Sequence, residues 1–400
     1  MKFIPRSAGR SRSMQAIKRA RDFLRRTDLL LFALCLTASV LGIVIIASAT
    51  RNFATSSRYP IVQTVALILG IALYFFFTLV DVDIFADRWP VMLVVEAALI
   101  LILIPFGVDI GGNTGWIDLG VISFQPTELV KFIFIILCSK HIAYLKEYRN
   151  LNSVLSMAQL FAHFGFLFAL ILVVSKDLGS ALVFLFVFIV LLYAGGTKLY
   201  WFLFGGAAMA VLIPLAWTNF LSDRHKERIL APYDPTIDPL GTDVNWQPFL
   251  AKKAISSGRL TGEGLFHGAQ TQSNYLESQH ADYVFASAGE ELGFIGCAFI
   301  LLLLVCIIVR CVVVGVRSRS TFGLLICIGV AASLTFQTFI NIGMSIGLTP
   351  VIGITLPFFS YGGSSMLTTF AAAGLVSGVY YRSKADSYGS EHRYLDIPDN

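Results

Sequence analysis

Charged residues are scarce in this sequence. Asp, Glu, Lys and Arg make up 14% of its 400 residues, whereas 56% are hydrophobic. An ordinary soluble domain carries about 25% charged residues, so this composition excludes one. Apolar runs of about 18 residues or more recur along almost the whole chain. Each could cross a hydrocarbon core of about 30 Å as a helix, and barrel strands are too short to explain them. The sequence therefore predicts an all-α integral membrane protein.

Cysteines are also few. All six lie in or at the ends of apolar runs, a placement that favours neither a disulfide framework nor a zinc site. A small-residue cleavage site is missing after the first apolar run, so we interpret this run as a retained span and not as a signal peptide.

About ten membrane-spanning helices are expected, which makes the protein polytopic. Their approximate ranges are 28–50, 60–80, 90–108, 125–145, 157–175, 178–195, 198–217, 284–310, 321–345 and 361–381. They form a transmembrane domain over 28–382, between a basic segment, 1–27, and a polar tail, 383–400. Lys and Arg concentrate in the cytoplasmic segments of membrane proteins, so their distribution predicts a cytoplasmic location for both termini.

The basic N-terminal segment holds nine Lys or Arg among its first 26 residues. Nucleic-acid binding is one interpretation, but no folded basic module follows the segment. Anchoring at an anionic membrane leaflet is the favoured interpretation. We therefore expect no nucleic-acid partner.

One connection is much longer than the others. Residues 218–283 join the seventh and eighth predicted spans and form a large outer loop, which predicts a function for it because long loops without one are uncommon. A smaller outer loop over 109–124 is rich in glycine. No fixed-period repeat is visible, which argues against a transporter built from inverted repeats.

Ionisable residues in or beside the spans are candidates for function, because burying them in a membrane is costly. Glu128 and Lys131 are three residues apart, so they share one helix face and can pair, either as a structural ion pair or in a site. Asp177 follows Lys176 in a short turn. It is either solvated or faces a cavity, where a carboxylate could bind a hydroxyl or a magnesium or manganese ion.

Residues 339–366 combine Asn341, two prolines and five glycines in an otherwise apolar run. Such breaks occur at membrane depth only where protein or a water-filled cavity satisfies the freed backbone groups. We expect a pocket wall here, with free backbone amides over 361–365 at a helix start that would favour an anion. Helix packing through small residues is the alternative.

Five segments together resemble the SEDS family, which comprises RodA, FtsW and SpoVE. They are "FQPTELVKF", "KDLGSALVF", "RILAPYDPTIDPLGTDVNWQPFLAKKAISSGRLTGEG", "HADYVFASAGEELGFIG" and "NIGMSIGLTPVIGITLPFFSYGGSS". The resemblance covers about residues 28–382. It implies a peptidoglycan glycosyltransferase of the bacterial cytoplasmic membrane that polymerises lipid II on the outer face, beside a class B penicillin-binding protein that acts as transpeptidase.

The resemblance also implies roles for individual residues. The family's essential outer-loop aspartate falls on Asp282, the predicted catalytic residue. Further family positions fall on Glu128, Lys131, Asp177 and Arg228. Together with Ser360, Gly362, Gly363 and Ser364 from the segment with the expected helix start, they are the expected substrate-binding residues. Two departures are visible: Gly115 stands where the family commonly has arginine, and Glu277 with Ser278 replaces a Pro-Glu pair.

The implied reaction is attack by an acceptor hydroxyl on the anomeric carbon of a lipid-diphosphate donor, with inversion. Asp282 would take the hydroxyl proton, a step that typically contributes about 100-fold to 10,000-fold. Glu290 and Glu291 are equally open to a structural and a catalytic role. The leaving undecaprenyl diphosphate would be stabilised by Lys131, by Arg228, by Lys252 or Lys253, or by a magnesium or manganese ion that the diphosphate partly holds. No organic cofactor is expected.

Two other functions compete with this one. A lipid II flippase also suits charged residues and broken helices within the membrane. The long loop carrying Asp282 on one side favours an enzyme, because a transporter has little need for a base on one side only. A scaffold that merely recruits a penicillin-binding protein would not require Asp282 at all.

Overall fold

The structure is a computed structural model that describes residues 21, 23–110, 113–120, 123–219, 223–234, 236–239 and 241–395. Most of the predicted basic segment 1–27 and the last five residues of the predicted tail 383–400 lie outside the described residues.

Within the described ranges, eight helical spans are long and apolar enough to cross a membrane, which confirms an all-α, polytopic membrane protein. These spans are α2 (Leu29–Ala49), α3 (Arg58–Leu79), α5 with α6 (Trp89–Leu101 and Leu103–Phe106), α8 with the π-helical turn η1 (Val154–Leu170 and Ile171–Ser175), α9 (Leu178–Gly195), α10 (Leu199–Asn219), α14 (Val284–Val316) and α15 (Thr321–Ser345).

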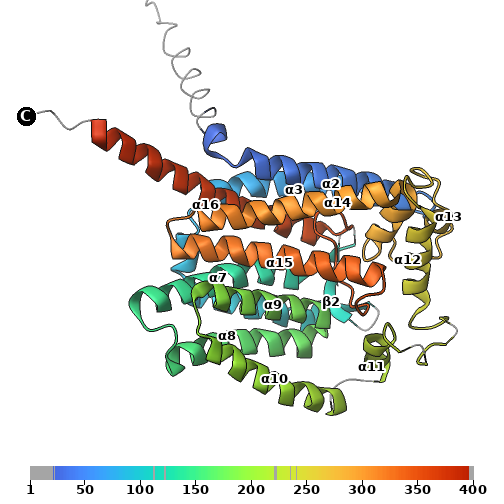
Figure 1. Ribbon diagram of the computed structural model, residues 1–400, viewed down its shortest axis with the longest axis horizontal. Helices are drawn as coiled ribbons and strands as arrows, with labels where there is room; N and C mark the ends of the chain where they lie inside the picture. Colours follow the sequence, from blue (N-terminus) through green and yellow to red (C-terminus); the bar gives the residue numbers. More distant parts are fainter. Residues whose placement is uncertain are drawn as a thin grey trace, which may run out of the picture.

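Two further long helices coincide with the remaining predicted spans. α7 (Pro126–Tyr148) carries more charge than the eight spans, and α16 (Gly363–Leu395) starts with small polar residues and continues past the predicted end at 381. Both run beside the other helices (Figure 1). The number of about ten membrane crossings stays a prediction.

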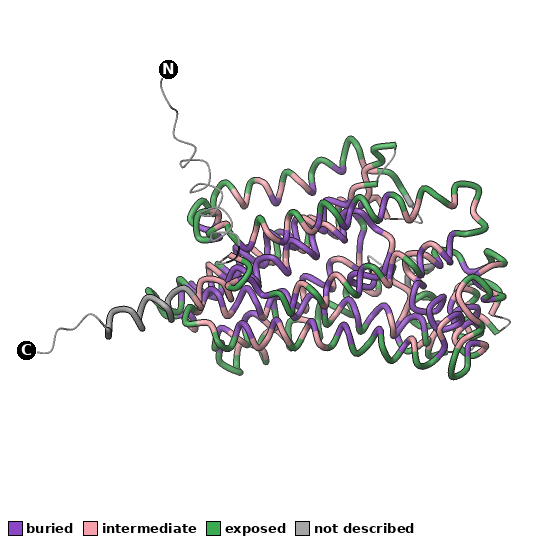
Figure 2. The backbone as a smooth tube through the Cα atoms, turned by 90° about the horizontal axis from the view of Figure 1, so that it is seen from above, coloured by how far each residue is buried: buried purple, intermediate pink, exposed green. Residues whose placement is uncertain are grey.

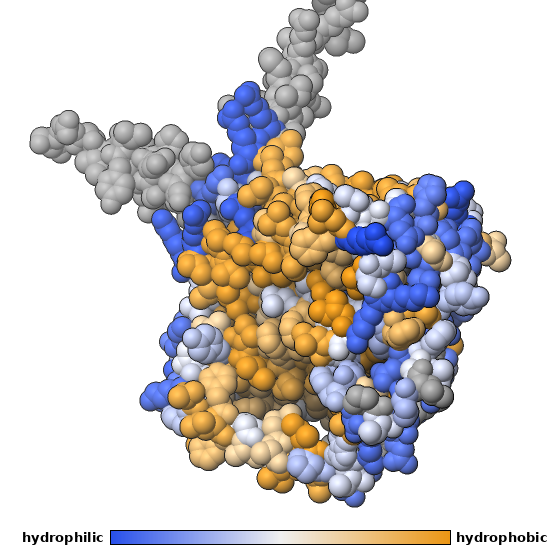
Figure 3. Space-filling view, turned by 45° about the vertical axis from the view of Figure 1, so that its right-hand side comes forward, coloured by the Kyte–Doolittle hydropathy of each residue, from blue (hydrophilic) through white to orange (hydrophobic). Residues whose placement is uncertain are grey.

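The helices lie side by side, and the long connection between α10 and α14 gathers at one end of the bundle (Figure 1). This connection, the outer loop, contains the helices α11 (Asp223–Leu230), α12 (Trp246–Ser257) and α13 (Ala269–Gln272). The start of α2, the short helix α4 (Asp83–Ala86) and the far end of α16 lie at the opposite end. Figure 3 shows apolar surface over the helices and hydrophilic side chains gathered toward the outer loop.

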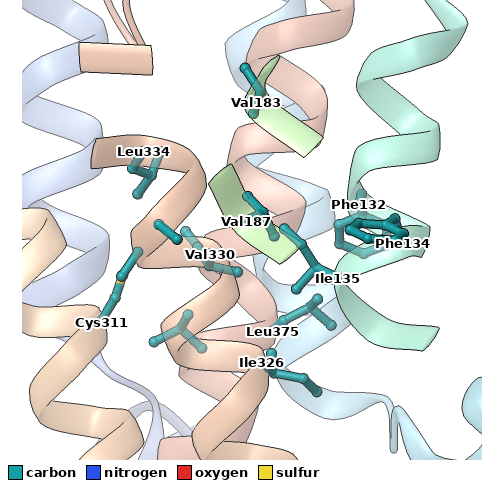
Figure 4. Close-up of a cluster of buried hydrophobic side chains, with 14 of the residues drawn as sticks. Phe132, Phe134, Ile135, Val183, Val187, Cys311, Ile326, Val330, Leu334 and Leu375 are labelled. Carbon is teal, nitrogen blue, oxygen red and sulfur yellow. The ribbon is translucent and has the colours of Figure 1, made fainter. Parts of the chain in front are cut away.

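Buried residues lie toward the centre of the bundle, and exposed residues lie on its outside (Figure 2). Phe134 of α7, Val187 of α9, Cys311 of α14 and Leu375 of α16 converge there with side chains of α15 (Figure 4). Gly329 lets α15 approach α7 closely, because a Cβ at this position would lie 2.8 Å from the Cγ2 of Ile135. Such close packing of small and large residues stabilises helix association where lipid removes the hydrophobic driving force.

The smaller outer loop folds into a three-stranded antiparallel sheet that the sequence analysis did not predict. Its strands are β1 (Gly107–Ile110), β2 (Asn113–Asp118) and β3 (Ser123–Phe124), in the order β1-β2-β3. The predicted span 90–108 therefore ends early, at Phe106, because the chain turns into β1. The Thr114 hydroxyl donates a 2.8 Å hydrogen bond to the carbonyl of Val174 and fixes the sheet to η1.

α14 is kinked at Gly293, whose φ of 66° and ψ of −166° are not helical. The outer loop supplies the backbone partners that the broken helix loses. The Glu263 N–H donates to the Glu290 carbonyl (2.9 Å), and the Phe294 N–H donates to the Arg259 carbonyl (2.9 Å). A second pair repeats the pattern one residue later: Gly264 N–H to the Glu291 carbonyl (3.0 Å) and Ile295 N–H to the Leu260 carbonyl (3.1 Å). Unpaired backbone groups at membrane depth are costly, so these bonds make the kink tolerable.

Candidate active site

A cavity of about 910 Å³ lies where the outer loop meets the helices. Its walls come from the β-sheet, the starts of α7 and α9, the outer loop, and the segment between α15 and α16. The cavity brings together seven of the nine predicted site residues: Glu128, Lys131, Asp177, Arg228, Asp282, Gly362 and Gly363. Ser360 and Ser364 do not line it, and neither do Lys252 and Lys253.

Asp282 stands in the turn before α14, and its half-buried side chain faces the cavity. Among the residues that the structure describes, none donates a hydrogen bond to its carboxylate. Burial and the nearby negative charge of Asp177 raise the pKa of Asp282 from 3.8 to about 6. Both effects disfavour the charged form. The carboxylate is therefore free to accept a proton, and it is more basic than an exposed one.

Asp177 is the N-cap of α9 and is buried. Its carboxylate accepts hydrogen bonds from the Ser180 N–H (2.8 Å), the Ser180 hydroxyl (2.7 Å) and the Gln125 side-chain amide (3.1 Å). A short polar residue followed by small residues is the usual start of a helix, because the side chain satisfies N–H groups that have no helical partner. The prediction that Asp177 faces a cavity fits this placement, although its oxygens already have three donors.

Glu128 and Lys131 form the ion pair that their spacing predicts. The Lys131 ammonium lies 2.9 Å from each oxygen of the Glu128 carboxylate, and both residues are buried. The Thr368 hydroxyl of α16 donates a further 3.2 Å hydrogen bond to Glu128. A buried pair stays charged when its charges are matched and hydrogen-bonded. The pair thus places a nearly neutral, strongly dipolar group on the cavity wall.

Unmatched positive charge enters the cavity from two exposed side chains. Arg228 belongs to α11, and Lys176 holds a left-handed conformation (φ 53°) between η1 and α9. Both line the same cavity as Asp282. An anionic group bound between the outer loop and the helices would meet these two cations first.

The segment before α16 differs in part from expectation. Gly362 and Gly363 line the cavity, but two of the amides expected to be free over 361–365 are already used: Tyr361 N–H donates to the His280 carbonyl (2.8 Å) and Gly362 N–H to the Gln63 side chain (3.1 Å). The reason is that Gln63, fully buried in α3, presents its amide to this turn. The start of α16 therefore offers fewer free donors than the sequence indicates.

Ser360 and Ser364 tie chain segments together. The Ser360 hydroxyl donates to the Ala281 carbonyl (2.6 Å) and accepts from the Leu356 N–H (2.7 Å). The Ser364 hydroxyl accepts from the Gln125 N–H (3.1 Å). These bonds lie behind the cavity wall, and the substrate-binding role of the two serines stays a prediction.

Glu290 and Glu291 point away from the cavity and hold the outer loop. Glu290 accepts from the backbone N–H groups of Gln270 (2.7 Å) and Thr271 (2.8 Å) at α13. Glu291 accepts from the Ser48 hydroxyl of α2 (2.6 Å). Of the two roles left open by the sequence, these contacts favour the structural one.

A scan against family models matches residues 28–385 to the FtsW, RodA and SpoVE family, described as cell cycle proteins. The chain belongs to this family. It is similar to the peptidoglycan glycosyltransferase MrdB of Escherichia coli K12, with 29% identity over 304 residues, 74% of this chain and 79% of MrdB. The resemblance to SEDS proteins that the motifs predict is thereby confirmed.

Solved structures of the FtsW, RodA and SpoVE family share the fold. A chain from a peptidoglycan synthase complex that coordinates polymerization and crosslinking is 30% identical, with a TM-score of 0.74 over 89% of this chain and 98% of that one. The crystal structure of the rod shape determining protein RodA of Thermus thermophilus is 27% identical, with a TM-score of 0.64 over 88% of this chain and 96% of RodA.

Two departures from the FtsW, RodA and SpoVE pattern have structural counterparts. A Cβ at Gly115 would lie 3.7 Å from an Asp177 carboxylate oxygen, so a longer side chain at 115 would start beside this aspartate. In this family member, Gln125 and Ser180 donate to Asp177 instead. Ser278, which replaces the family's glutamate, adopts a left-handed conformation (φ 51°) in the turn that leads to Asp282.

Several buried polar residues escaped the sequence analysis although they lie in apolar runs. Gln63 of α3 supports the turn before α16, and Gln125 bonds to Asp177. Glu96 of α5 is fully buried and lies 3.0 Å from the Nε2 of His163 in α8. The rule that selected Glu128, an ionisable residue inside a span, would also have selected Glu96 and His163.

Proposed function

We propose that the protein is a peptidoglycan glycosyltransferase that joins lipid II units into glycan strands at the outer face of the bacterial cytoplasmic membrane. The observation that carries the proposal is the Asp282 carboxylate, which faces a large cavity at the head of a membrane helix and accepts no hydrogen bond from any described residue. The name of the relative MrdB supports the same activity. A lipid II flippase is not favoured, because translocation gives no role to a free base at one end of the bundle.

The reaction follows from the placement of Asp282. An acceptor sugar hydroxyl attacks the anomeric carbon of the donor, its proton passes to the Asp282 carboxylate, and the bond from that carbon to the diphosphate oxygen breaks. The glycosidic bond forms with inversion, and the polyprenyl diphosphate leaves with the bonding electron pair. With its pKa raised to about 6, Asp282 is still ionised at neutral pH but is a better base than an exposed carboxylate.

The leaving diphosphate requires positive charge. Arg228 and Lys176 supply this positive charge at the cavity, while the charge of Lys131 is largely neutralised by its ion pair with Glu128. Among the described residues, no group of three or more His, Cys, Asp or Glu side chains could hold a metal ion. A magnesium or manganese ion fits better as a companion of the diphosphate, because such ions use one or two carboxylates plus phosphate oxygens and water. Asp282 and Asp177 would be its protein neighbours.

Further features of the proposal concern the surroundings. Similarity to a peptidoglycan synthase complex supports a class B penicillin-binding protein as transpeptidase partner, with lipid II as substrate and undecaprenyl diphosphate as product. The two described ends of the chain lie at the end of the bundle opposite the outer loop. This arrangement supports cytoplasmic termini and an outer location for Asp282.

Purified protein in proteoliposomes, supplied with lipid II, the partner transpeptidase and magnesium or manganese, tests the proposal. Wild type should form glycan polymer, and Asp282→Asn should be slower by about 100-fold to 10,000-fold. Asp223→Asn is the matched control, because this outer-loop carboxylate is 94% exposed and its ion-pair partner among the described residues is Lys226. Polymer formation by Asp282→Asn at the wild-type rate contradicts the proposal, and so does translocation of labelled lipid II without any polymer.

A further inference from the structure

Asn341 of α15 connects two neighbouring chain segments of the cavity wall. It is fully buried. Its side-chain amide donates one 2.8 Å hydrogen bond to the backbone carbonyl of Asp282 and a second 2.8 Å hydrogen bond to the backbone carbonyl of Ile354. Both residues line the cavity, one from the outer loop and the other from the segment between α15 and α16. The two carbonyls are 72 residues apart in sequence but share one donor group.

An asparagine side chain suits this position for a chemical reason. Its NH₂ group has two donors in a fixed plane, so a single side chain can satisfy two carbonyls at once. Asp282 lies in a turn and Ile354 in a segment without regular structure, so neither carbonyl belongs to a helix or strand ladder. A buried carbonyl left without a donor is unfavourable. If Asn341 lost its amide, both segments would have to move to find other partners.

The Asn341 amide affects the proposed base through its backbone, because no described residue forms a hydrogen bond with the Asp282 carboxylate. No described residue donates to that side chain, so its position depends on the backbone of Asp282 and on the adjoining segment of the cavity wall. This wall passes close by: a Cβ at Gly353, beside Ile354, would lie 3.8 Å from an Asp282 carboxylate oxygen. Asn341 thus fixes the backbone from which the Asp282 side chain extends, and it also fixes the neighbouring wall segment that limits the movement of this side chain.

Neighbouring hydrogen bonds support the same turn but do not reach Asp282 itself. The Ser360 hydroxyl donates to the Ala281 carbonyl (2.6 Å), and the Tyr361 N–H donates to the His280 carbonyl (2.8 Å). Together these bonds dock residues 280–281 onto the turn before α16. Among the described residues, the bond from Asn341 is the one that reaches the backbone of the base, and the same amide links it to the segment at Ile354.

We propose that Asn341 is the positioning residue of Asp282: its amide holds the backbone of the base against the adjoining segment of the cavity wall, in the position that proton transfer requires. The inference rests on the proposed function. Small displacements of a catalytic group are expensive, since about 1 Å can cost about 100-fold in rate. Removing the amide should therefore lower turnover more than substrate binding, because the groups that contact lipid II elsewhere in the cavity keep their places.

The test compares Asn341→Leu, which keeps the approximate shape but has no donors, with wild type in the proteoliposome assay. We expect kcat to fall by about 10-fold to 100-fold, with KM for lipid II within about threefold of wild type. Ser345→Ala is the matched control, because Ser345 is buried one turn further along α15 and donates only to the Asn341 carbonyl. Its kcat should stay within about twofold of wild type.

A double variant separates positioning from general stability. If Asn341 acts through Asp282, then Asn341→Leu should change the residual rate of Asp282→Asn by less than about twofold. A merely structural role predicts the same loss in both backgrounds and would overturn the inference. Asn341→Gln, which keeps the amide but moves it by one methylene, covers the case in which Asn341→Leu does not fold. It should lose about threefold to tenfold in kcat at an unchanged Tm.

Hydrogen exchange gives a readout that does not depend on activity. In Asn341→Leu, backbone amides over 279–284 and 352–356 should exchange faster than in wild type, whereas those of α7 should not change. If the two segments keep their wild-type protection from hydrogen exchange, the proposed role of Asn341 is refuted. If the wild type forms no glycan under any condition, the proposed function fails, and the exchange measurement still decides whether Asn341 holds these segments.

Discussion

Replacing Asp282 by asparagine should make the protein more stable at neutral pH while it abolishes most of the activity. The folded structure disfavours the ionised carboxylate, because burial and Asp177 raise its pKa from 3.8 to about 6. Asparagine fills the same space without a charge. The variant would therefore remove a cost that the wild type carries for its chemistry, a common relation between stability and activity at functional sites.

The size of this gain follows from the pKa shift. Each pKa unit corresponds to about 1.4 kcal/mol, so a shift from 3.8 to about 6 sets an upper limit of about 3 kcal/mol. The side chain borders an open cavity, and screening by water reduces the expected gain to about 1–2 kcal/mol. For a chain of 400 residues, that corresponds to a rise of about 1–2.5 °C in apparent Tm.

The pH dependence of unfolding tests whether Asp282→Asn raises stability, as the raised pKa predicts. A raised folded-state pKa means that the ionised group destabilises the fold fully above about pH 6 and not at all below 3.8. Thermal unfolding in detergent at pH 7.5 and pH 4.5 should therefore show a gain for Asp282→Asn at the higher pH that shrinks at the lower one. Asp223→Asn, an exposed control, should show no gain. An Asp282→Asn variant that melts at or below wild type at pH 7.5 refutes the reasoning, as does a gain independent of pH.

Three other outcomes are expected. The kcat/KM of polymerisation should fall tenfold per pH unit below about pH 6, the pKa of Asp282, because the base must be ionised. A pH–rate profile measures this fall. A fall that begins only near pH 4 would contradict the assignment of Asp282 as the base. Lys131→Met should lower the free energy of unfolding by about 3–5 kcal/mol, because it leaves Glu128 buried without its partner. Adding Glu128→Gln should restore most of the loss in chemical denaturation, and a double variant as unstable as the single one would argue against the ion pair. Gly293→Ala should lower the free energy of unfolding by about 2 kcal/mol or more, because the backbone at 293 has a positive φ and a Cβ there would collide with the outer loop. The control Gly205→Ala, which places its Cβ in open space on α10, should have the Tm of the wild type.

Local patterns in the sequence predicted the parts of the site that depend on single segments. The spacing of Glu128 and Lys131 indicated their pairing, and the structure forms the ion pair. Asp177 was expected in a short turn between two spans, and the structure places it at the end of this turn, where it caps α9. The apolar runs likewise located the helices, because their length and composition alone suit a membrane span.

Features that depend on distant backbone groups could not be predicted in this way. Asn341 was expected to line a pocket wall, but its bonds to Asp282 and Ile354 depend on how three separate segments dock. Glu290 looked equally suited to catalysis until its partners at α13 were known. The β-sheet was missed because four- and six-residue strands rich in glycine give a weak periodic signal.

The kink at Gly293 has a consequence for how sequences in this region can change. The outer loop is joined to α14 through main-chain hydrogen bonds, in the manner of an added strand. Backbone hydrogen bonds do not depend on the type of side chain, so substitutions at solvent-facing positions over 259–264 leave the four hydrogen bonds to α14 intact. Insertions or deletions there shift the register of all four bonds at once. Natural variation in this stretch should therefore consist of exchanges of residue type at constant length, except at Gly262, where a Cβ would collide with the Glu291 carbonyl.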